Sequence, residues 1–295
     1  MTEILQSTLS IAVFTFTVTS MLSVGLGYSL KEILEPLRDW QAVARAVVAN
    51  FVFVPILALV ILRSVPLEPG WQIGLLLLAS AAGAPFLIKL TQVAQGPTAL
   101  SATLLVIVVP LTVVFMPIVV EAMVPEADVS AGAIAGELAM TLLVPLAIGL
   151  FVHHRTADFA RRARPIFGKI ATVALIVLFV SIVALNLPAI GEMIVSLALV
   201  AAVLFLLGTF AIGYLVARPG RGRRTVLALG TAQRNVAAAT LVASQSIADR
   251  GALLMVTFVS VLELLVLFPF ARRLRKRARP ATSAPPGSGF AGAPG

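Results

Sequence analysis

The chain has 295 residues, of which 59% are hydrophobic and only 12% are charged, and its mean hydropathy is +1.04. Soluble domains hold roughly 45–50% apolar residues, so this composition excludes an ordinary soluble globular protein. The net charge of +9 is carried by short basic clusters between apolar runs, which argues against a nucleic-acid partner, and the lack of cysteine excludes disulfides and thiolate metal sites.

Nine apolar runs are long enough to cross a bilayer as helices, since each crossing takes about 20 residues. In chain order they lie near residues 7–30, 40–63, 71–94, 98–120, 132–153, 166–187, 192–217, 225–247 and 251–271. The runs are continuously apolar, which predicts helices and not barrel strands. We therefore expect an all-α polytopic membrane helix bundle with one transmembrane domain over residues 1–279. A disordered cytoplasmic tail should follow over residues 280–295.

Basic residues sort onto alternate connections between these runs. The connections after the first, fifth and seventh runs, and the segment after the ninth, hold Lys31, Arg38, Arg155, Arg161, Arg162, Arg164, Arg218, Arg221, Arg223, Arg224 and the arginine-rich stretch 272–279. Because loops rich in Lys and Arg stay in the cytoplasm, nine spans place the N-terminus outside and the C-terminus inside. This pattern predicts a multi-pass protein of the cell inner membrane.

The third run contains a cation at a place where a helix is weak. Lys89 follows Gly83 and Pro85 in the stretch SAAGAPFLIKLTQ. Glycine and proline both disfavour a continuous helix, so the stretch predicts a broken one. Broken helices at membrane depth are typical of transporter binding sites. The alternative is that the flexible Lys89 stem carries its ammonium to the nearby loop at residues 95–97.

The eighth run contains a second cation beside a second predicted break. Arg234 follows Gly230 in the stretch ALGTAQRNVAAAT, in which three further polar residues are Thr231, Gln233 and Asn235. Arg234 lies too deep in its run for easy access to the membrane surface, so it should face a cavity or a partner. The alternative is a purely structural role.

The two predicted breaks have corresponding positions in the chain. The third and eighth runs are five apart, an odd offset, so they cross the membrane in opposite directions. If runs one to four repeat as runs six to nine, each break falls in the third element of its unit and a pseudo-two-fold axis brings the breaks together. The fifth run is then unpaired.

Four stretches in this order carry a resemblance: VGLGYSL, TQVAQGPTALSATLL, LLVPLAIGLFVHH and QRNVAAATLVAS. They resemble the bile acid:sodium symporter family, and the likeness runs over most of the chain. The resemblance implies two inverted five-helix repeats, a panel domain and a core domain, and two broken helices that cross beside the substrate and two sodium ions. It also implies that this chain lacks the first helix of the family, which explains the unpaired run.

The chain departs from this family at the residues that would bind sodium. Where relatives carry a small polar pair in the first crossover, this chain has Leu87 and Ile88. Where relatives carry an acidic residue and a glutamine before the position of Asn235, it has Gly230 and Arg234. Sodium needs several oxygen ligands, so we expect altered or absent sodium coupling and no other cofactor.

Fixed cations near both positions suggest how an anion could still be carried. The substrate-binding candidates are the polar residues of the two breaks, Arg234, Lys89, Asn235, Gln233 and Thr231. The candidates for ion coupling are Glu263, Thr112 and Gln233. A buried carboxylate such as Glu263 suits proton coupling, and the alternative for Glu263 is a permanent ion pair.

The function that these residues favour is secondary transport of a small organic anion, of carboxylate, sulfonate or sterol-acid type, by alternating access. An enzyme would need a nucleophile with a base, paired carboxylates or a metal cluster, and none has useful spacing in the sequence. The alternative is a membrane-embedded sensor or structural protein without transport activity. The expected partners are the lipid bilayer and the anion, and we expect a monomer.

Overall fold

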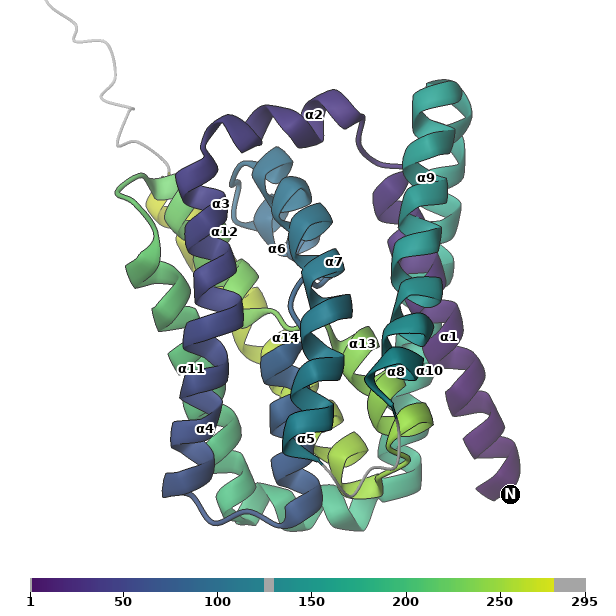
Figure 1. Cartoon of the computed structure of the whole chain (residues 1–295), viewed down its shortest axis with the longest axis vertical. Helices are drawn as coiled ribbons and strands as arrows, with labels where there is room; N and C mark the ends of the chain where they lie inside the picture. Colours follow the sequence, from purple (N-terminus) through teal and green to yellow (C-terminus); the bar gives the residue numbers. More distant parts are fainter. Residues whose placement is uncertain (1, 125–129, 279–295) are drawn as a thin grey trace, which may run out of the picture.

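The computed structural model describes residues 2–124 and 130–278, and all regular structure in this part of the chain is helical (Figure 1). Seven of the described helical stretches are long and apolar enough to cross a membrane. They consist of α1 (Thr2–Gly25), α3–α4 (Trp40–Val48 and Val54–Ser64), α7 (Thr98–Met123), α8–α9 (Ala131–Leu138 and Val144–Arg155), α10 (Ala157–Val195), α11 (Leu197–Val216) and α14 (Arg250–Ala278). The prediction of an all-α bundle is confirmed. The predicted tail, 280–295, lies outside the described residues.

Two of these stretches contain a π-helical turn that ends two residues before a proline. Residues Ala49–Phe53 join α3 to α4 ahead of Pro55, and residues Ala139–Leu143 join α8 to α9 ahead of Pro145. Proline has no N–H and its ring clashes with the carbonyl four residues earlier, so the helix widens by one residue there without ending. The first π turn carries the buried Asn50.

The third and eighth predicted spans are each divided into two shorter helices. The first pair is α5 (Pro69–Ser80) and α6 (Phe86–Val93), and the second is α12 (Arg221–Ala232) and α13 (Val236–Leu241). Gly83 lies in the first interruption with a φ of +85°, and a Cβ there would lie 2.7 Å from Val109 Cγ2, so both conformation and space favour glycine.

The second interruption falls at residues 233–235, later than the sequence suggested. Gly230 was predicted as the breaking residue, yet it lies inside α12. Its lack of a side chain serves packing instead, because a Cβ at Gly230 would lie 3.0 Å from Leu87 Cδ2 on α6. The helix ends after Ala232.

The long helices form two groups, with α1, α9 and α10 packed together on one side (Figure 1). Glycines allow α1 and α9 to approach closely. A Cβ on Gly25 would lie 2.4 Å from the Leu146 carbonyl oxygen, and one on Gly149 would lie 2.6 Å from the Leu22 carbonyl oxygen. Small residues at such crossings are typical of helix packing within a membrane.

The second group holds α3–α7 and α11–α14, and the broken helices lie within it. Its outer helices, like those of the first group, expose large apolar side chains, for example Ile11 (67%), Val114 (62%) and Ile176 (57%). The interior instead contains buried polar and charged groups, among them Arg234 and Glu263. A bundle with an apolar surface and a polar centre suits a lipid environment. Short α2 (Leu30–Leu34) crosses one end of the bundle and links the two groups (Figure 1).

Candidate functional site

The two interruptions are joined by hydrogen bonds through Asn235. Its backbone N–H donates to the carbonyl oxygen of Ala81 at 2.9 Å, and its Nδ2 donates to the carbonyl oxygen of Gly83 at 3.2 Å. Its Oδ1 accepts from the backbone N–H of Ala238 at 3.2 Å and caps the start of α13. One fully buried side chain thus begins a helix and holds the other interruption in place.

Thr112 on α7 fixes the first interruption from the other side. Its Oγ1 accepts from the N–H of Ala82 and donates to the carbonyl oxygen of the same residue, each at 3.0 Å. Thr112 is fully buried. The hydroxyl therefore satisfies two backbone groups that the broken helix leaves without partners.

The Arg234 guanidinium is fully buried and caps the C-terminal ends of both broken helices. Nε donates to the Leu78 carbonyl oxygen at 2.8 Å and Nη2 to the Ala79 carbonyl oxygen at 2.9 Å, both in the last turn of α5. Nη1 donates to the Thr231 carbonyl oxygen at 3.1 Å in the last turn of α12, and to Asn50 Oδ1 at 2.6 Å. Carbonyl groups at a helix C-terminus lack partners and carry partial negative charge, so a cation is stabilised where two such ends meet.

Glu263 of α14 lies on the other side of this segment and is fully buried. It accepts a hydrogen bond from Gln233 Nε2 at 3.0 Å. Its two carboxyl oxygens each lie 3.4 Å from the backbone nitrogen of Arg234 and accept from that N–H. The carboxyl group thus contacts the main chain of Arg234, while the guanidinium contacts the oxygens of α5, α12 and Asn50.

The positions at which the sequence lacks sodium ligands pack directly against one another. Leu87 on α6 fills the space beside Gly230 on α12, and it belongs to an apolar cluster with Leu90, Leu229 and Ala232. A carboxylate at position 230 would need Leu87 to move. The carbonyl oxygens near Arg234 already accept from its guanidinium. The side chains at positions 87 and 230 therefore offer sodium no oxygen ligand.

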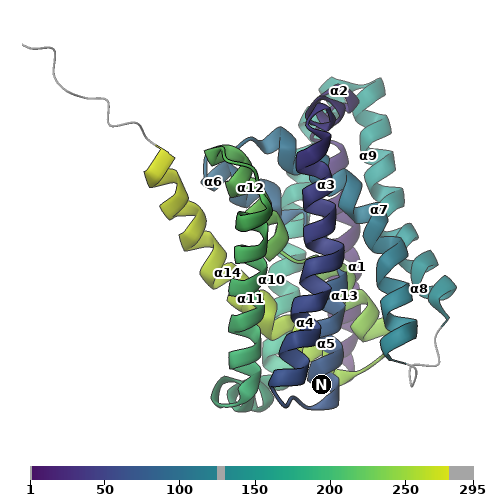
Figure 2. The ribbon, with the colours of Figure 1, turned by 60° about the vertical axis from the view of Figure 1, so that its left-hand side comes forward.

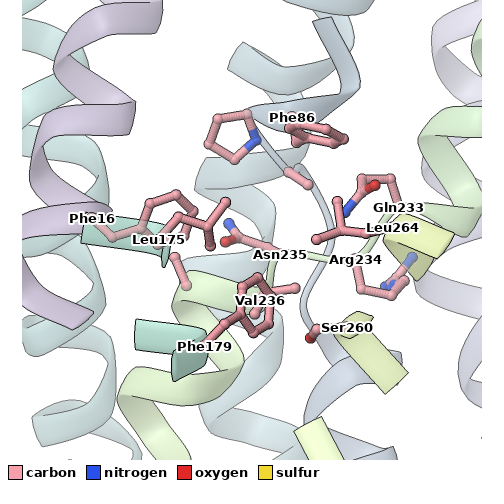
Figure 3. A pocket seen from close by; sticks show the side chains of 13 residues that line it. Phe16, Phe86, Leu175, Phe179, Gln233, Arg234, Asn235, Val236, Ser260 and Leu264 are labelled. Atoms are coloured by element: carbon pink, nitrogen blue, oxygen red, sulfur yellow. The ribbon is translucent and has the colours of Figure 1, made fainter. Parts of the chain in front are cut away.

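A small cavity lies beside the second interruption, with Gln233, Arg234 and Asn235 in its wall (Figure 3). Its volume is about 30 Å³, enough for about one water molecule. Asn235 points toward Phe16 and Leu175, whereas the Arg234 guanidinium lies on the opposite side of the segment (Figure 3).

A larger cavity of about 250 Å³ lies between the two helix groups. It contains two cations, the exposed Lys89 of α6 and the half-buried Arg164 of α10, together with hydroxyl groups of α1 and α10. Phe16, Phe86 and Leu175 line both cavities, so the two spaces are neighbours. The structure therefore separates the two predicted cations, since Arg234 lies at the interruptions and Lys89 lines the larger cavity. The other predicted site residues lie at the interruptions with Arg234: Thr231, Gln233, Asn235, Glu263 and Thr112.

Sequence reasoning missed two members of this region. Arg164 was grouped with the loop cations, but it belongs to α10, which begins at Ala157, and its guanidinium stacks 5.4 Å from the Tyr28 ring centroid. Asn50 lies in the second apolar run and was not among the predicted site residues. An amide five residues after Arg45 and five before Pro55, in the middle of a span, was the signal that could have marked it as a buried partner.

A family model described as the Sodium Bile acid symporter family matches residues 15–193, which is more than half of the chain. The chain belongs to this family. As a member of the Sodium Bile acid symporter family with seven long apolar helices, it is a multi-pass membrane protein of a transport family. The match contains the first interruption and ends before the second, so Arg234 and Glu263 lie beyond it. No curated protein matches the chain in sequence.

Proposed function

We propose that this chain is a secondary transporter that carries a small organic anion, of carboxylate, sulfonate or sterol-acid type, through the cell inner membrane. The observation that supports this most directly is the cavity between the two helix groups, where Lys89 and Arg164 lie beside apolar side chains. Its volume of about 250 Å³ lies just below the range of about 300–1,000 Å³ for small-molecule sites, which suits a small anion. Cations and apolar walls together suit an amphipathic anion.

Alternating access would use the boundary between the helix groups. In this proposal α1, α9 and α10 form the panel and the other long helices form the core. The broken pairs α5–α6 and α12–α13 each cross the membrane, which gives nine spans, an external N-terminus and a cytoplasmic C-terminus. Spans one to four and six to nine would be inverted repeats, and movement of core against panel would open the Lys89 cavity to one side at a time.

Coupling in this proposal does not require sodium. The Arg234 guanidinium lies where two helix C-termini and Asn50 offer oxygens, which is the setting in which transporters hold a cation. The tethered guanidinium would stabilise the two interruptions whether or not sodium is present. The anion would meet Lys89 and Arg164 in the larger cavity, and it would reach the polar groups of Asn235 and Gln233 only after the water-sized cavity beside them had widened.

Purified protein should first be screened for thermal stabilisation by carboxylates and sulfonates, because a ligand that binds the native state raises the apparent stability. Uptake of the stabilising compound into proteoliposomes should then be measured in sodium, potassium and choline. We expect saturable uptake that is equal in the three cations. No uptake of any stabilising anion would refute transport, and a steep requirement for sodium would refute the coupling mechanism.

A further inference from the structure

A third cavity, larger than the two described above, lies at the end of the bundle that carries the basic loops. It has a volume of about 800 Å³. It is lined by the end of α11, the start of α12, the C-terminal part of α14 and the loop after α6. Figure 2 shows that this part of α14 leans away from the bundle. The cavity shares no lining residue with the Lys89 cavity.

Arginines give this cavity a positive charge. Arg224 of α12 and Arg273 of α14 both line it, and its described lining contains no Asp or Glu. Arg224 Nε is buried and has no hydrogen-bond partner among the described residues. The Arg224 guanidinium lies 5.2 Å from the Tyr214 ring centroid, which holds it in place at the cavity wall. A buried guanidinium N–H without an acceptor favours an anionic oxygen beside it.

Another part of the lining is aromatic. Phe210 of α11 and Phe270 of α14 meet edge to face with ring centroids 5.5 Å apart. Beyond the cavity, the outer surface of α11 is apolar, with Leu207 48% exposed and Leu215 78% exposed. The cavity therefore combines a cationic part with an aromatic part that continues onto a lipid-type surface. A soluble phosphate would use only the first of these, whereas a phospholipid would use both.

We propose that this cavity binds an anionic phospholipid, with the phosphodiester at Arg224 and Arg273 and the acyl chains along Phe210 and Phe270. Basic pockets between transmembrane helices are suited to such headgroups. The bound lipid would fill the space that α14 leaves and would tie α14 to α11 and α12. This role concerns lipid binding alone and does not depend on the proposed transport function.

Native mass spectrometry of the delipidated full chain, titrated with phosphatidylglycerol or phosphatidylcholine, tests the proposal. We expect phosphatidylglycerol to bind at least about tenfold more tightly, and this preference to be lost in a variant with Arg224→Gln and Arg273→Gln. Arg275→Gln is the matched control, because Arg275 is an exposed arginine of α14 that does not line the cavity. It should bind phosphatidylglycerol as the wild type does.

Gel filtration in detergent checks that each variant folds. If Arg224→Gln prevents folding, the exposed Arg273→Gln carries the test alone, with a smaller loss of preference expected. Retention of the preference in the cavity variants, or equal loss in Arg275→Gln, would overturn the proposal. Displacement of the lipid by inorganic phosphate would assign the site to a soluble anion instead. A dimer that holds no lipid would assign the surface to a second copy of the chain.

Discussion

Replacing Arg234 by glutamine should strongly destabilise the protein. The guanidinium donates four hydrogen bonds to buried oxygens, of Leu78, Ala79, Thr231 and Asn50. A buried polar group left without a partner costs about 1–3 kcal/mol. Glutamine can restore one or two of these bonds, so two or three oxygens lose their donor, and we expect a loss of about 4 kcal/mol in the free energy of unfolding.

The assay is thermal unfolding of purified protein in detergent, with Arg234→Lys and Arg45→Gln beside Arg234→Gln. Lysine keeps the charge but not the planar fork, so its loss should be about half as large. Among the described residues, the half-buried Arg45 guanidinium makes a single long hydrogen bond, 3.4 Å to the Val216 carbonyl oxygen, so its replacement should cost less than about 1 kcal/mol.

The effect of sodium on the stability of the same variant is a second test. The oxygens released by Arg234→Gln are all neutral, and the Glu263 carboxyl group remains engaged by Gln233 and by the backbone N–H of residue 234. We therefore expect sodium chloride and choline chloride to give Arg234→Gln the same stability. An Arg234→Gln variant as stable as the wild type would refute the role of the guanidinium as a cap, and stabilisation by sodium alone would mean that a complete ion site lies beneath it.

Three further changes test other parts of the structure. Lys89→Gln should weaken binding of the transported anion by about tenfold without changing the unfolding temperature, whereas Lys31→Gln, an exposed lysine outside the cavity, should leave affinity unchanged in the same titration. Gly149→Ala places a methyl group against the neighbouring helix backbone and should lower the unfolding temperature by several degrees, and Gly136→Ala, where a Cβ meets nothing within 4 Å, should not. Thr112→Val leaves two buried backbone groups without partners and should cost about 2 kcal/mol in thermal unfolding, so a neutral result would show that the interruption does not need its hydroxyl.

The fold could be predicted because its signals lie along the chain. Apolar runs of membrane length predict helices from local sequence, and Gly83 and Pro85 coincide with the first interruption because both act on their own backbone. The prediction that Gly230 breaks its helix was wrong for a physical reason. A glycine that ends a helix and a glycine that admits a neighbouring leucine look the same in one sequence, and only the contact with Leu87 distinguishes them.

The site could be predicted in part. A buried arginine in an apolar run must have partners, so Arg234 stood out. Its partners did not, because two are carbonyl oxygens of Leu78 and Ala79, more than 150 residues away in the chain. Every residue has a carbonyl group, so no side chain marked them. Arg164 was missed because a cation that lines a cavity from a helix end has the same sequence signature as a cation in a loop.

The fixed charge of Arg234 has an electrical consequence for transport. Two helix C-termini carry about half a negative charge each, so the guanidinium neutralises them and stays with the protein throughout the cycle. An anion that moves alone would then carry its own charge across the membrane, with no sodium to compensate. Each 100 mV is worth about 2.3 kcal/mol for one elementary charge, or about a fiftyfold change in accumulation. We therefore expect a potassium diffusion potential, positive inside the proteoliposomes, to increase accumulation of a monovalent anion. Accumulation that does not change with the membrane potential but increases with a proton gradient would instead mean that a proton travels with the anion. Glu263→Gln should then abolish the accumulation driven by the proton gradient.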